Sequence, residues 1–121
     1  MKTIVTLEEI AQVLICFLGI YLLPISLSWW VWLLLFFLPD VSIAGYALGN
    51  RAGAVLYNVF HHKAIAVAVF AAGFLTHSVE LQATGVILYA HSAFDRALGY
   101  GLKTFRSFHH THLGFIGTAK Q

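Results

Sequence analysis

The stretch that decides the fold runs from Trp29 to Leu48, WWVWLLLFFLPDVSIAGYAL, and Asp40 is its only charged side chain. A helix needs roughly 20 mostly apolar residues to cross a bilayer, and this stretch has that length. We therefore expect a transmembrane helix that begins after a cap at Ser28. A carboxylate deep in hydrocarbon costs roughly 2.5–3.5 kcal/mol on insertion scales, so Asp40 is expected to be paired or functional.

Composition extends this expectation to the whole chain. Of its 121 residues, 60% are hydrophobic and 10% are charged, whereas soluble domains carry about 25% charged residues. The fold class we expect is all-α: a polytopic membrane bundle of four transmembrane helices in a single domain, residues 1–121. The expected helices are 7–23, 29–48, 53–75 and 81–102, and a His-rich tail follows at 103–121.

The basic residues predict how the bundle is oriented. The links at 24–28 and 76–80 contain no lysine or arginine. The opposite side holds Lys2, Arg51, Lys103, Arg106 and Lys120. By the positive-inside rule we expect both termini in the cytoplasm of a multi-pass inner-membrane protein. The net charge is only +2 and no basic stripe appears, so the expected partner is the lipid bilayer and not nucleic acid.

Titratable residues fall at similar depths in three of the expected helices. Asp40 lies near the centre of the second, His61 and His62 lie in the third, and His91 and Asp95 lie in the fourth. At about 1.5 Å of rise per residue, these groups occupy a slab on the order of 10 Å thick. We therefore expect acids and imidazoles from separate helices to meet in one polar chamber.

Imidazole and carboxylate groups together can ligate a divalent ion, and this mixed set suits zinc, manganese or iron. The expected metal ligands are Asp40, His61, His91 and Asp95, and the expected catalytic residues are Asp40, His91 and Asp95. His91 and Asp95 are four residues apart and share a helix face, so they can equally form a buried hydrogen-bonded pair.

Pro39 precedes Asp40 and leaves the carbonyl of Leu35 without its helical partner. The resulting kink, with an acid beside it, can form a polar notch that lines a cavity. The structural alternative is a salt bridge from Asp40 to Arg51 or Arg96.

Candidate substrate contacts lie on the cytoplasmic side of this chamber. Asn58 can share a face with His61 or with His62, and only one of these histidines is expected to point inward. Arg96 and Lys103 can hold a phosphate near the headgroup level. The tract with His109, His110 and His112 can bind metal, or fold back so that His112 caps the site. The full set of expected substrate contacts is Asn58, Arg96, Tyr100, Lys103 and His112.

Several segments are similar to a family of small bacterial integral membrane proteins known as domain of unknown function 4260. They are Pro39-Asp40-Val41-Ser42, Gly45-Tyr46, Tyr57-Asn58-Val59-Phe60-His61, Ala90-His91, Phe94-Asp95-Arg96-Ala97-Leu98-Gly99-Tyr100-Gly101-Leu102-Lys103 and Thr111-His112-Leu113-Gly114. The resemblance runs from Leu7 to Gly117, and its most specific part runs from Asp95 to Lys103.

This resemblance implies a four-helix membrane protein of bacterial type with no established activity. It also implies that His61, rather than His62, matches the family's histidine in the third helix. The family often carries an acid just before its Thr-His-Leu-Gly segment, where this chain has His110.

Three functions remain open on the sequence. The favoured one is a metal-dependent membrane hydrolase of a lipid-like substrate, whose ion generates hydroxide near neutral pH. The second is a small proton- or cation-coupled transporter, which would require a homo-oligomer because four short helices rarely enclose a pathway alone. The third is a structural membrane subunit whose buried polar groups only fix the register of its helices.

Overall fold

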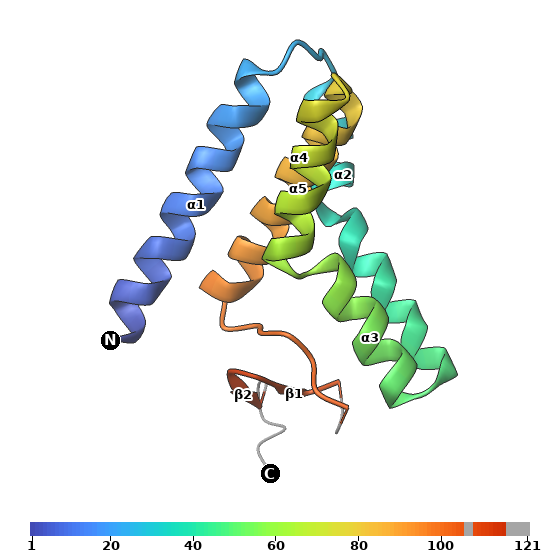
Figure 1. The fold of residues 1–121 in the computed structure, drawn as a ribbon. Helices are drawn as coiled ribbons and strands as arrows, with labels where there is room; N and C mark the ends of the chain where they lie inside the picture. The colour runs from blue at the N-terminus through green and yellow to red at the C-terminus, as the bar shows by residue number, and fades with distance from the viewer. Residues whose placement is uncertain (106–107, 116–121) are drawn as a thin grey trace.

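The computed structural model describes residues 1–105 and 108–115 and confirms the all-α fold class (Figure 1). Its elements are α1 (Lys2–Leu22), α2 (Trp29–Phe37), the 3₁₀ helix η1 (Leu38–Leu48), α3 (Asn50–Phe60), α4 (Lys63–Leu75), α5 (Val79–Ala97), β1 (His110–Thr111) and β2 (Gly114–Phe115). The two short strands form an antiparallel hairpin in the expected tail.

Helix α5 is the centre of the arrangement. It packs along α4 and α1 and also touches α2, while α3 packs mainly against η1. In Figure 1 the η1–α3 pair leans away from α4 and α5, and the β1–β2 hairpin lies below the end of α5. The buried residues of α5 are mostly small, which lets neighbouring helices approach closely on several sides.

Two expected helices are interrupted at the same level, which corrects the sequence prediction. The helix expected at 29–48 is α-helical only to Phe37 and continues as a 3₁₀ helix, because Pro39 cannot donate a backbone hydrogen bond. The helix expected at 53–75 begins at Asn50 and breaks at His61 and His62, and its two halves are bent by 47°.

Side chains stabilise both sides of the second break. His62 is extended and its Nδ1 accepts a hydrogen bond from the Ala64 N–H, so it caps α4. Arg96 donates to the carbonyl of His61 at 3.4 Å. Lys63, the first residue of α4, donates to Glu9 at 2.6 Å and to Gln12 at 2.7 Å, which fastens α1 to the start of α4.

The fourth helix also differs from the expected range 81–102. It begins at Val79, where the Ser78 hydroxyl accepts from the Leu81 N–H. It ends at Ala97, because Gly99 has a φ of 91° and the Tyr100 N–H closes on the Asp95 carbonyl. The first helix, expected at 7–23, is observed at Lys2–Leu22.

Two described helical stretches, α1 and Trp29–Leu48, are long and apolar enough to cross a membrane. The bent pair of α3 and α4 makes a third if it is counted as one span. The helix α5 is not among them, because its composition is too polar: it includes the charged residues Glu80, Asp95 and Arg96. The predicted orientation stays a prediction, and Arg106 and Lys120, on which it partly relies, lie outside the described residues.

The close contact of α4 and α5 predicts that the substitution Gly85→Ala destabilises the fold. A Cβ at Gly85 would lie 2.5 Å from the backbone nitrogen of Phe70, so one helix must shift. We expect the free energy of unfolding in detergent to fall by about 1–3 kcal/mol. The control is Gly19→Ala on α1, where a Cβ meets nothing within 4 Å and should cause no loss. Equal stability of the two variants would contradict this packing.

Candidate metal centre

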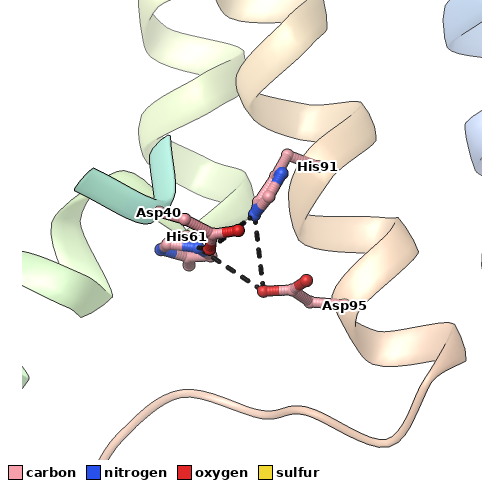
Figure 2. Close-up of side chains that lie close together, drawn as sticks. All are labelled: Asp40, His61, His91 and Asp95. Carbon is pink, nitrogen blue, oxygen red and sulfur yellow. Dashed lines mark hydrogen bonds and ion pairs between the residues drawn. The ribbon is translucent and has the colours of Figure 1, made fainter. Parts of the chain in front are cut away.

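Four side chains from three segments meet where the two helices break (Figure 2). Asp40 comes from η1, His61 follows α3, and His91 and Asp95 come from α5. Asp40 Oδ1 lies 3.2 Å from His61 Nε2 and 3.1 Å from His91 Nε2. Asp95 Oδ2 lies 3.4 Å and 3.6 Å from the same two nitrogens. The structure therefore brings together all four expected metal ligands.

The four groups are not equally shielded. The side chains of His61 and His91 are 3% and 1% exposed, and that of Asp95 is 12% exposed. The Asp40 side chain is 42% exposed, so the cluster is open to its surroundings at Asp40. His62 is exposed, which identifies His61 as the inward histidine of the pair.

The second ring nitrogen of each histidine is held by a backbone carbonyl. His91 Nδ1 lies 2.7 Å from the oxygen of Phe36, and His61 Nδ1 lies 2.8 Å from the oxygen of Tyr57. A carbonyl oxygen can only accept, so each Nδ1 must carry the proton. In a neutral ring the Nε2 then carries a lone pair, and here it faces carboxylate oxygens, which also carry lone pairs.

This arrangement needs a cation or protons between the nitrogens and the oxygens. Either a metal ion occupies the centre, or each contact is a hydrogen bond whose proton is carried by the ring or by the carboxyl group. A tetrahedral zinc ion with bonds of about 2.0–2.1 Å separates its ligand atoms by about 3.4 Å. The four nitrogen–oxygen separations of 3.1–3.6 Å are near that value, and all four ligand atoms lie within 4.8 Å of one another, so the four groups are close enough to share one ion.

The helix break explains why the Phe36 carbonyl is free to hold His91. In a 3₁₀ helix the carbonyl of residue i pairs with the N–H of residue i+3, and for Phe36 that residue is Pro39, which has no N–H. The sequence prediction placed the freed carbonyl at Leu35, but this one accepts from the Leu38 N–H. The change from α to 3₁₀ geometry moves the free group by one residue.

Tyr57 is the residue of the site that sequence reasoning missed. Its hydroxyl donates to Asp95 Oδ2 at 3.0 Å, and its ring stacks on that of His61 with centroids 3.8 Å apart. Its carbonyl also accepts from His61, so one residue orients two candidate ligands. The available signal was its position four residues before His61, on the same helix face.

Lys103 lies beside Tyr57, in the segment that follows α5. It is 4% exposed, and its ammonium lies 4.7 Å from the ring centroid of Tyr57 and 4.1 Å from that of Phe108. Burial lowers the pKa of Lys103 to about 8, an effect that Asp95 and Asp40 partly oppose. The Asn58 amide contacts both backbone polar groups of Lys103, at 2.7 Å and 2.6 Å.

The other expected substrate contacts lie around this segment. Arg96 holds the His61 carbonyl, and Tyr100 is exposed beyond the end of α5. His112 accepts from the Leu102 N–H at 2.8 Å, which places it on the tail's own backbone and not over the cluster. Partial burial and the nearby Arg96 lower the pKa of His112. Outside the cluster, His110 pairs with the Thr104 hydroxyl, and His109 is exposed.

The structural alternative for Asp40 is wrong for the described residues. Its ion pairs are to His61 and His91, whereas the Arg51 guanidinium lies over the Phe105 ring at 4.9 Å. Arg96 is committed to a backbone carbonyl. Asp40 therefore pairs with the two histidines of the cluster and not with either arginine.

Comparison with known proteins gives one match. The model of the family described as domain of unknown function (DUF4260) matches residues 2–116, which is nearly the whole chain. No curated protein and no solved structure matches the chain.

The lowered pKa of Lys103 predicts how stability depends on pH. The folded protein releases this proton near pH 8, whereas the unfolded chain holds it until about pH 10.5. Between these values the unfolded state binds more protons, so the free energy of unfolding should rise with pH, by up to about 1.4 kcal/mol per pH unit.

The variant Lys103→Met should lack this rise, and the exposed Lys2→Met control should keep it. The measurement is the free energy of unfolding in detergent from pH 7 to pH 10.5 for the three proteins. Parallel curves for the wild type and Lys103→Met would show that the ammonium is not buried as described.

Proposed function

This chain belongs to the domain of unknown function (DUF4260) family, and we propose that it is a metal-dependent hydrolase of a lipid-like substrate in a bacterial inner membrane. The observation that supports the proposal is the direction of the two Nε2 lone pairs. Both point at carboxylate oxygens 3.1–3.6 Å away, and a divalent ion between them satisfies all four groups.

The exposed fractions of the four side chains in the cluster suggest two different roles. His61, His91 and Asp95 are buried and held by further hydrogen bonds, so they form a rigid set of three ligands. Two histidines with one carboxylate leave coordination positions open, as catalytic sites require. Asp40 is the exposed member, so it can share the ion or take a proton from the attacking water.

A divalent ion held by these ligands supplies a Lewis acid and lowers the pKa of bound water toward neutrality. Tyr57 keeps Asp95 oriented through its hydroxyl and keeps His61 oriented through its carbonyl and ring. Both contacts act on a ligand and not on the substrate, which makes Tyr57 a positioning residue.

The lipid-like substrate is inferred from two groups on the cytoplasmic side. The Lys103 ammonium is buried against aromatic rings, without a carboxylate within ion-pair distance among the described residues. The Tyr46 hydroxyl is buried and has no hydrogen-bond partner there, and its ring also packs on Phe108. An ammonium and a free hydroxyl beside the centre suit an anionic group such as a phosphate.

One alternative function uses the same geometry. Protonation of both histidines also supplies positive charge to the cluster, as in a proton relay. A proton- or cation-coupled transporter built on this site would require a homo-oligomer, and it would conduct in liposomes without a bound metal.

The proposal predicts that protein purified without chelators contains, or takes up, about one zinc, manganese or iron ion per chain. Asp95→Asn and His61→Ala should lose most of this metal, because each removes a buried ligand. The matched control is His62→Ala, which removes the neighbouring exposed imidazole and only a helix cap.

Metal content is measured by elemental analysis after incubation with each ion. Wild-type protein that stays metal-free would argue for the protonated cluster. Equal metal loss in the His61 and His62 variants would argue for unspecific binding by surface histidines.

A second prediction concerns the positioning residue. Tyr57→Phe keeps the ring that stacks on His61 but removes the hydrogen bond to Asp95. We expect metal affinity to fall by about 10–100-fold, as for other groups that orient ligands. Competition with a chelator of known affinity measures the change, and Tyr100→Phe serves as the exposed control. An unchanged affinity would mean that Asp95 needs no support from Tyr57.

A further inference from the structure

A cavity of about 320 Å³ lies between α2, the start of η1 and α5. Its wall is almost entirely apolar and includes Trp32, Leu35, Ala83 and Leu88. Its polar side chains, Glu80 and Thr84, are near the N-terminal end of α5. The cavity is thus an apolar space that runs along the half of α5 before His91.

The inner end of this cavity adjoins the candidate metal centre. Pro39 and Phe60 line it, and each immediately precedes a cluster residue, Asp40 or His61. Ile87 lines it as well and is one helical turn before His91, on the same face of α5. Three of the four cluster residues are therefore neighbours of the cavity wall.

Along α5 the centre lies between the cavity and the buried ammonium. One face of α5 between Glu80 and Leu88 lines the cavity, His91 and Asp95 follow, and Lys103 comes after the helix has ended. A molecule with an apolar chain and an anionic group could reach both features only by passing the cluster. Its bond between chain and anionic group would then lie at the centre.

We propose that this cavity holds one hydrocarbon chain of an anionic membrane lipid whose polar part is cleaved at the metal centre. The assignment rests on the proposed function, because the centre supplies the reaction. We assign a hydrocarbon chain to this cavity because the part of its wall near the metal centre has no polar side chain that could hydrogen-bond a ligand. A polar substrate would leave its own groups unpaired there.

A second apolar cavity provides an internal comparison. It has a volume of about 260 Å³, lies between α1, α4 and α5, and is lined by Cys16, Phe70 and Val86 among others. None of its lining residues directly precedes or follows a cluster residue. A bilayer chain that fills any available hollow should enter both cavities, whereas a substrate chain should favour the first.

The test uses a phosphatidylglycerol with a diazirine at the end of one chain, in nanodiscs with the full-length protein. After irradiation, mass spectrometry locates the crosslinks. We expect crosslinks at Ala83, which is buried, and at Ile87, which is half-buried, more often than at the second cavity. Leu14 and Leu18 on α1 are exposed and report contact with surrounding lipid.

A bulky side chain that fills the first cavity should remove the crosslinks in that cavity and leave those on α1 unchanged. Ala83→Phe should lose labelling at Ile87 and Leu88, keep it at Leu14, and keep the metal. Thr84→Phe fills the cavity from an exposed position and replaces Ala83→Phe if that variant does not fold. Ala72→Phe adds the same ring at an exposed position of α4 and should change nothing.

The outcomes separate this inference from the proposed function. Asp95→Asn should lose the metal but retain the cavity crosslinks. Crosslinks in a wild-type protein that binds no metal would support the chain site and overturn the hydrolase. Labelling that is equal in both cavities, or unchanged by Ala83→Phe and Thr84→Phe, would overturn the chain site.

Discussion

The hydrogen bonds from two imidazole rings to backbone carbonyls are the constraint on which the rest of the structure depends. They fix the proton on Nδ1 of His61 and His91 and turn both Nε2 atoms toward the carboxylates. A pair of neutral rings in this state repels the acids it faces. The fold is therefore organised around a place for a cation or for shared protons, between two rings and two carboxyl groups.

The two helix breaks allow a helical protein to form these hydrogen bonds between imidazole rings and backbone carbonyls. In a regular helix each interior carbonyl already accepts a backbone hydrogen bond and is enclosed by its own helix, so it is less available to a histidine on another helix. The 3₁₀ segment with Pro39 releases the carbonyl of Phe36, and the break after Phe60 lets the His61 ring turn back to Tyr57. Both irregular segments lie beside protein groups, where unpaired backbone can be tolerated in a membrane.

Much of the site could be predicted from the sequence, because charged and titratable residues stand out in otherwise apolar helices without any coordinates. Asp40, His61, His91 and Asp95 stood out by their depth alone. Tyr57 did not, since a tyrosine in an apolar helix is ordinary and its role comes from a stacked ring and a carbonyl. The break at His61 was also hidden, as no proline or glycine marks it. The end of α5 was misplaced although Gly99 was in view, because apolar residues continue past it to Leu102.

The clamp between Asn58 and Lys103 links the site to the order in which the chain is made. Asn58 belongs to α3, but its two partners are backbone groups of a segment that follows every helix. Asn58 is therefore made well before its partner, which follows the last helix of the chain. The contact joins residues 45 positions apart, so this end of the chamber closes only when the segment after α5 has docked against α3.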